Sequence, residues 1–167
     1  MIWRGRLAGG LEIPSVRRYV EKEKTVTDAP TSKRAFAIIV AVITVTVTMM
    51  ALDLTWLGIV ARGIYDSSLG PLKRQEVFWP AALLFYALYV AAIVIHAVAG
   101  STSGAQAFKR GAGIGLLSYG TYDLTNWAVL AGWPAAIVPI DIAWGIVLTA
   151  TVSFLGKRAM MRAERAS

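Results

Sequence analysis

Long apolar stretches separated by short polar ones dominate the chain. Four of these stretches are long enough for a helix to cross a bilayer, which takes about 20 residues. They cover residues 35–60, 79–99, 111–131 and 134–155. The stretches lack the continuous polar face that a helix of a soluble bundle needs. The pattern therefore predicts an all-α integral membrane protein, with a four-helix bundle formed by residues 35–156.

Polar sequence flanks this domain on both sides. Residues 1–34 hold eight Lys/Arg and four Asp/Glu and contain no apolar run long enough for a signal-peptide core. We expect a disordered extension there, in which Val16 to Lys24 could form a short helix on the lipid surface. Residues 157–167 are basic and are expected to form a tail.

Positive charge predicts the orientation of the helices. The extension, the second loop and the tail hold eight, two and four Lys/Arg, which makes fourteen, against three in the first loop and none in the third. Because short loops rich in Lys and Arg stay in the cytoplasm, both termini are predicted to be cytoplasmic. Trp79 and Trp133 then fall at outer helix ends, where aromatic rings are enriched.

Composition excludes several classes of function. The chain is 56% hydrophobic and 16% charged, with a mean hydropathy of +0.57. It has no cysteine and one histidine, so thiol chemistry is excluded, and we expect no metal site and no cofactor. The net charge of +7 comes from residues beside the apolar segments, not from a basic patch interleaved with aromatic residues. Nucleic acid is therefore not an expected partner.

Three acidic residues interrupt the apolar segments, and each is followed three or four positions later by a tryptophan. The pairs are Asp53 with Trp56, Asp123 with Trp127, and Asp141 with Trp144. That spacing places acid and ring on one face of a helix. At 1.5 Å per residue, all three acids lie roughly 10–14 Å below the outer end of their segment, so we expect one layer.

Other polar side chains are expected at the same depth. Tyr86 and Tyr89 of the second segment can reach the layer. The third segment carries a stripe at helical spacing, formed by Gly111, Gly115, Tyr119, Tyr122, Asp123 and Asn126. Its glycines would let a neighbouring helix approach closely. Arg62 is the nearby basic residue on the outer side and could pair with a carboxylate if the chain bends there.

Three interpretations of the acidic layer remain open. A charged side chain inside a membrane costs about 2.5–3.5 kcal/mol, so the acids must point inward. They are then either protonated or neutralised by a cation or a polar ligand head group. Alternatively, they act as hydrogen-bonding groups between helices, at about 0.6 kcal/mol per interaction.

The same residues lie in segments that resemble a known family. The segments are Leu52-Asp53-Leu-Thr-Trp-Leu-Gly58 with Arg62 and Tyr65, then Tyr119-Gly-Thr-Tyr-Asp-Leu-Thr-Asn126, then Gly132-Trp133-Pro134 and Asp141-Ile-Ala-Trp-Gly145. Residues 35–156 resemble the bacterial four-helix membrane family DUF2177, whose function is unknown. The resemblance implies a four-helix membrane fold in the bacterial inner (cytoplasmic) membrane. It implies no activity.

The leading hypothesis is a protein that binds a membrane lipid or another small molecule in a polar pocket of the outer half. The candidate pocket residues are Asp53, Trp56, Arg62, Tyr86, Tyr89, Tyr119, Tyr122, Asp123, Asn126, Trp127, Asp141 and Trp144. One alternative is an accessory subunit that stabilises a membrane-protein partner or a homo-oligomer. Two others are an intramembrane enzyme with a protonated aspartate as general acid, and proton or cation translocation.

Overall fold

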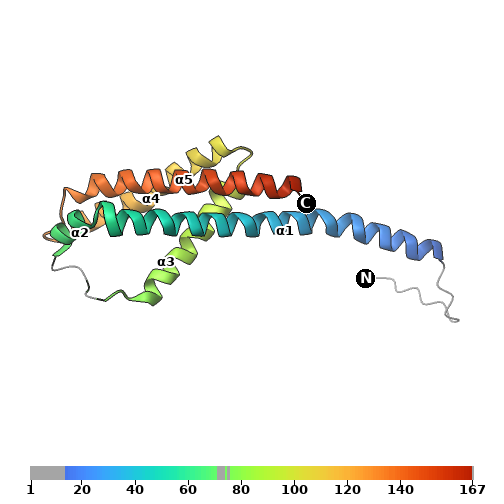
Figure 1. The fold of residues 1–167 in the computed structure, drawn as a ribbon, viewed down its shortest axis with the longest axis horizontal. Helices are drawn as coiled ribbons and strands as arrows, with labels where there is room; N and C mark the ends of the chain where they lie inside the picture. Colours follow the sequence, from blue (N-terminus) through green and yellow to red (C-terminus); the bar gives the residue numbers. More distant parts are fainter. Residues whose placement is uncertain (1–13, 71–73, 75, 167) are drawn as a thin grey trace.

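The computed structural model describes residues 14–70, 74 and 76–166, and every regular element in this part of the chain is helical. The elements in chain order are α1 (Pro14–Thr55), the π-helical turn η1 (Trp56–Val60), α2 (Arg62–Leu69), α3 (Trp79–Ala92), the π-helical segment η3 (Ile93–Ala99), α4 (Gly104–Val129) and α5 (Ile137–Ala166). Figure 1 shows their arrangement. The predicted all-α class is confirmed.

Three helices of the described chain are long and apolar enough to cross a membrane. They are Ser32–Val60, Trp79–Ala99 and Ile137–Ala166. Helix α4 has 26 residues and is about 39 Å long, but it does not reach the same apolarity. Its sequence includes Lys109, Arg110 and Asp123 besides several glycines and hydroxyl residues. Helices capable of crossing a membrane are therefore found at three of the four predicted segments.

Two helices extend beyond the predicted segments. Helix α1 begins at Pro14, so residues 14–34, expected to be disordered, are helical; residues 1–13 of the expected extension lie outside the described part. Proline suits the first helical position, where its missing N–H is not needed, and the Glu, Lys and Arg that follow favour helix. Helix α5 likewise continues through the basic segment to Ala166.

Helix α5 is the centre of the packing. It contacts α1 along one side and α4 along the other, and η3 contacts all three of these helices. The buried core between them includes Val45, Met49, Ile93, Leu148 and Val152. Figure 1 shows α1 and α5 side by side, with α1 continuing past the C-terminal end of α5.

Glycines bring α4 and α5 into close contact. A Cβ atom on Gly115 would overlap the carbonyl group of Gly145. A Cβ atom on Gly111 would overlap the Thr149 carbonyl oxygen and the Ser153 hydroxyl. The prediction that these two glycines let a neighbouring helix approach closely is confirmed.

Helix α3 packs differently from its continuation η3. Ile93, Val94 and Val98 of η3 are buried, whereas Leu84 and Leu88 of α3 are exposed. Among the described elements, α3 packs mainly against η3 and α1, and Tyr89 in its last turn also shares a hydrogen bond with Thr149 of α5. Figure 1 shows α3 running obliquely away from the other helices toward its first residue.

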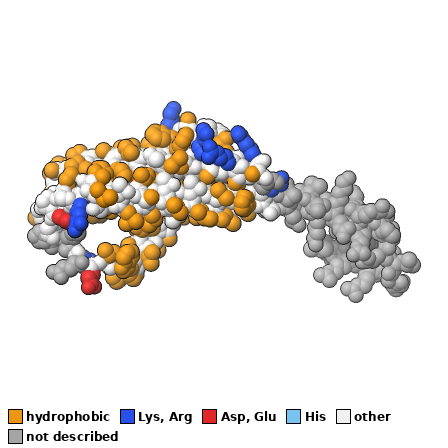
Figure 2. Space-filling model, in the orientation of Figure 1, with side chains coloured by type: hydrophobic (Ala, Val, Ile, Leu, Met, Phe, Trp, Pro, Cys, Tyr) orange, Lys and Arg blue, Asp and Glu red, His pale blue; other side chains and the backbone are white. Residues whose placement is uncertain are grey.

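Charged residues separate along the bundle. At one end of the bundle, called the C-terminal end, the start of α4 packs against the later part of α5. A side chain at Gly104 of α4 would contact Phe154 and Arg158 of α5 there, and Arg110 donates a hydrogen bond to the Gly100 carbonyl. On the face shown in Figure 2, most Lys and Arg side chains lie over the half nearest this end. The acidic side chains visible on that face lie at the opposite end, called the α2 end.

Candidate functional site

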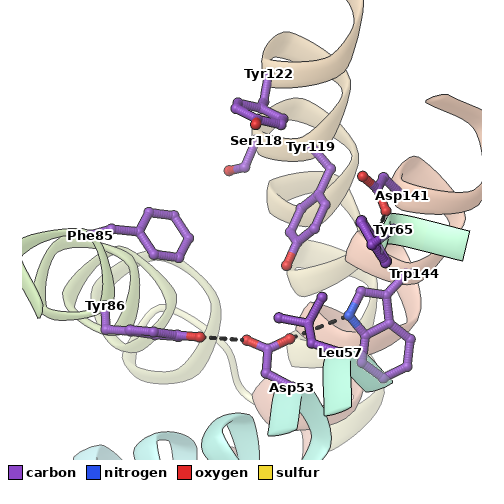
Figure 3. A pocket seen from close by; sticks show the side chains of 10 residues that line it. All are labelled: Asp53, Leu57, Tyr65, Phe85, Tyr86, Ser118, Tyr119, Tyr122, Asp141 and Trp144. Atoms are coloured by element: carbon purple, nitrogen blue, oxygen red, sulfur yellow. Dashed lines mark hydrogen bonds between the residues drawn. The ribbon is translucent and has the colours of Figure 1, made fainter. Parts of the chain in front are cut away.

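A cavity of about 410 Å³ lies between α3 and the other helices. Its lining residues come from six elements and are Asp53, Leu57, Tyr65, Phe85, Tyr86, Ser118, Tyr119, Tyr122, Asp141 and Trp144 (Figure 3). Most of them are aromatic, and two are carboxylic acids. The volume falls within the range of about 300–1,000 Å³ that is common for small-molecule sites.

Asp53 of α1 is held by two donors from different helices. Its Oδ1 atom accepts a hydrogen bond from Trp144 Nε1 of α5 at 3.3 Å, and its Oδ2 atom accepts one from the Tyr86 hydroxyl of α3 at 3.2 Å. The side chain is only 6% exposed. Since a buried carboxyl group is costly without partners, these bonds make its position in the wall of the cavity tolerable.

Asp141 of α5 is held by a residue from α2. The Tyr65 hydroxyl donates a hydrogen bond to Asp141 Oδ1. This contact depends on the bend between α1 and α2, where the helix widens into η1 and then breaks at Ala61 (φ −103°, ψ 2°). The π-helical turn therefore allows α2 to fold back over the cavity, which fits the frequent occurrence of such turns at functional sites.

Stacked rings fix the orientation of Trp144. The indole of Trp56 lies parallel to that of Trp144, with ring centroids 4.3 Å apart and an interplanar angle of 6°. On the other side of the cavity, Phe85 stacks on Tyr89 at 5.3 Å. Trp56 and Tyr89 thus support lining residues without being lining residues themselves. Tyr89 is further held by a hydrogen bond with Thr149 at 2.7 Å.

Asp123 does not line the cavity, contrary to the predicted layer of three acids. It is fully buried, and neither of its carboxyl oxygens has a hydrogen-bond partner in the described structure. On α4, Asp123 is rotated about 100° from Tyr122 and about 140° from Ser118 but only about 40° from Tyr119, and these three residues all line the cavity. The structure therefore brings Asp53 and Asp141 to one cavity and leaves Asp123 outside its lining, although Tyr119, one helical turn earlier, lines the cavity.

Two other candidate residues lie away from the cavity. Arg62 forms its ion pair with Asp66, one helical turn away at 3.6 Å, instead of with a buried carboxylate. The bend at Ala61 leaves Arg62 on an exposed face of α2. Trp127, four residues after buried Asp123, is 52% exposed and does not line the cavity. Trp127 belongs to the last turn of α4, and the half-buried Asn126 beside it does not line the cavity either.

Six of the predicted residues do line the cavity, and four lining residues were not predicted. The six are Asp53, Tyr86, Tyr119, Tyr122, Asp141 and Trp144, and the four are Leu57, Tyr65, Phe85 and Ser118. Tyr65 could have been predicted, since it follows the Asp53 segment in the family resemblance. Leu57 and Phe85 could not, because the sequence holds many equivalent apolar residues.

The lining limits the chemistry of the cavity. In the described part of the chain, no three His, Cys, Asp or Glu side chains lie close enough together to hold a metal ion. Lysine and arginine are likewise absent from the described lining. Aromatic walls and carboxylate oxygens remain, which suits a ligand with an apolar body and a hydrogen-bond donor.

The helices and their apolar surface define a helical membrane protein. Residues 38–157 match the model of a family described as "Predicted membrane protein (DUF2177)". The match covers well over half of the chain, so the chain belongs to this family. No curated protein and no solved structure matches the chain. Inferences about its activity therefore depend on the site.

Proposed function

We propose that this protein binds a lipid or another small amphiphilic molecule in the cavity between α3 and the other helices. The observation that carries the proposal is the lining: six aromatic side chains and two carboxylic acids around about 410 Å³. Rings provide apolar contact, and a few placed polar groups fix the head of a ligand.

The proposal includes a position in the bacterial cytoplasmic membrane, with both termini in the cytoplasm and α4 as a fourth spanning helix. Helix α4 supports this because it packs along the apolar helix α5 and is long enough to cross about 30 Å of hydrocarbon. The basic residues at the C-terminal end support the orientation. The cavity then lies in the outer half.

Reporter fusions test this topology. A fluorescent protein that folds only in the cytoplasm should be bright when fused after Ser167, and a periplasmic phosphatase fused at the same point should be inactive. The reverse pattern would place the C-terminus outside. An active phosphatase fused after Trp133, between α4 and α5, would support α4 as a spanning helix, and an inactive one would oppose it.

The divergence of α3 supports a lateral route from the bilayer into the cavity. Phe85 and Tyr122 are 47% and 56% exposed, while Asp53 is almost fully buried. A ligand could therefore place its polar head near the acid and leave its apolar chain between α3 and α4, next to lipid. Such a route suits an amphiphile better than a small water-soluble molecule.

Two neighbouring substitutions test occupancy of the cavity. Ser118→Phe would fill the cavity, whereas Leu117→Phe adds a ring at a position that is 70% exposed and outside the lining. We expect native mass spectrometry of gently extracted wild type and Leu117→Phe to detect a bound amphiphile, which Ser118→Phe loses. Equal retention by both variants, or no bound molecule in the wild type, would contradict the proposal.

A further inference from the structure

The charged groups of the cavity all carry the same sign. Asp53 and Asp141 line it, and no lysine or arginine does so in the described chain. Arg62, the basic residue that follows η1, is paired with Asp66 and directed away, with 73% of its side chain exposed. An anionic head group would meet two acids without a compensating cation, and repulsion between like charges is strong where water is excluded.

Both acids retain unused acceptor capacity. A carboxylate offers about four acceptor positions. Asp53 receives bonds from Trp144 and Tyr86, and Asp141 receives one from Tyr65 on its Oδ1 atom alone. Unlike the oxygens of Asp123, Asp141 Oδ2 is not sealed away from the cavity. A ligand that donates hydrogen bonds would therefore find acceptors that the protein leaves free.

The walls around these acids favour a cation. Figure 3 shows aromatic rings from α3, α4 and α5 surrounding the space beside Asp53, among them Phe85, Tyr119 and Trp144. The face of an aromatic ring attracts an ammonium group within about 6 Å, and the attraction grows when the cation is desolvated. Acids with free acceptors and aromatic walls together form the arrangement that recognises an amine.

We infer that the ligand is an amphiphile with a protonated amine as its head group. The ammonium lies between Asp53 and Asp141, donates hydrogen bonds to their free oxygens and offsets one of their two negative charges. Its apolar chain leaves between α3 and α4. This inference rests on the proposed function, because it names the class of ligand for the same cavity.

Three probes of equal chain length separate the possible head groups. The probes are a primary alkyl amine, the corresponding alcohol and the corresponding carboxylate, titrated into the full-length protein in a non-ionic detergent with thermal stability as the readout. The amine should bind most tightly and give the largest rise in melting temperature. Asp141→Asn should weaken amine binding about tenfold or more, since a bond to a charged acceptor is lost, and should change alcohol binding less.

Asp123→Asn is the matched control, because it removes a buried carboxyl group outside the cavity. It should leave amine binding unchanged, and an equal loss in this variant would overturn the inference. Alcohol or carboxylate binding as tight as that of the amine would also overturn it, while the proposed function would stand. Failure of all three probes would overturn both. If Asp141→Asn does not fold, as judged by circular dichroism without ligand, Asp53→Asn provides the same test.

Discussion

The two halves of residues 79–99 form one continuous helical segment and yet pack in opposite ways. In η3, Ile93 and Val98 are fully buried between α1, α4 and α5. Gly156 of α5 makes room there, because a Cβ atom on it would meet Val45 at 2.6 Å and Val98 at 3.3 Å. Beside α3, rings such as Phe85 of α3 and Tyr119 of α4 face each other, and the cavity lies between them (Figure 3).

This difference shows how one bundle can combine a rigid part with an accessible one. Small residues such as Gly115, Gly145 and Gly156 allow α5 to approach its neighbours closely. The aromatic residues of α3 and α4 instead face each other across the cavity. Regions with few buried apolar contacts open at lower free energy than well-packed ones, so α3 is the element that can adjust to a ligand.

The largest expected effect comes from shortening a buried side chain in the well-packed part of the bundle. Leu148→Ala, at a fully buried position, should lower the free energy of unfolding by about 2–5 kcal/mol. Leu88→Ala on α3, at a position that is 63% exposed, should change it by less than about 0.5 kcal/mol. Thermal melting of the two purified variants compares them. Similar losses would mean that α3 is packed as tightly as the core.

A second comparison concerns the glycines of α4. Gly115→Val should destabilise the protein by about 1–3 kcal/mol, because any side chain there overlaps the Gly145 backbone. Gly113 has open space around it, so Gly113→Val should cost less than about 1 kcal/mol. Detergent-denaturation midpoints of the two variants measure the difference. Equal midpoints for Gly115→Val and Gly113→Val would contradict the close approach of α4 to α5.

The buried acids give a third comparison. Asp53→Leu leaves the Tyr86 hydroxyl and the Trp144 N–H without their acceptor, which should cost about 1–3 kcal/mol. Asp123→Leu removes a carboxyl group that has no partner in the described structure, so stability should stay equal or rise. Melting curves of both variants decide. A marked loss in Asp123→Leu would reveal a partner that Asp123 binds.

The smallest effect is expected for a single donor. Trp144→Phe removes the N–H that binds Asp53 and keeps an aromatic ring beside Trp56. A hydrogen bond between membrane helices contributes about 0.6 kcal/mol on average, so stability should fall by about that amount. Such a change is measured by replicate melting curves of Trp144→Phe compared with those of Trp79→Phe, a control at an exposed position. A loss as large as that of Asp53→Leu would mean that the indole does more than donate this bond.

The sequence predicted the features that depend on local pattern. Hydropathy located the three candidate spans, and helical spacing identified the buried acids and the close-packed glycines of α4. The positions of Asp53, Tyr86 and Trp144 at one site also followed, because their depths can be counted along straight helices.

Features that depend on how helices cross could not be predicted in this way. Asp123 belongs to the predicted stripe, but among the residues of that stripe only Tyr119 and Tyr122 line the cavity. Tyr65 reaches Asp141 because η1 and the break at Ala61 change the direction of the chain between α1 and α2. The periodicity of apolar residues in the sequence does not predict that change. Arg62 could pair with a buried carboxylate by its position along the chain, but it pairs with Asp66, one turn further along α2.

Photocrosslinking of a ligand within the cavity tests the central claim most directly. An alkyl amine and an alkyl alcohol with the same photoreactive chain would be irradiated with the full-length protein, and the labelled peptides mapped by mass spectrometry. The account predicts labels at lining residues of α3 and α4, such as Phe85 and Tyr122, which Ser118→Phe abolishes and Leu117→Phe preserves. Labels spread over exposed positions such as Leu83 and Leu117, unchanged in Ser118→Phe, would contradict it.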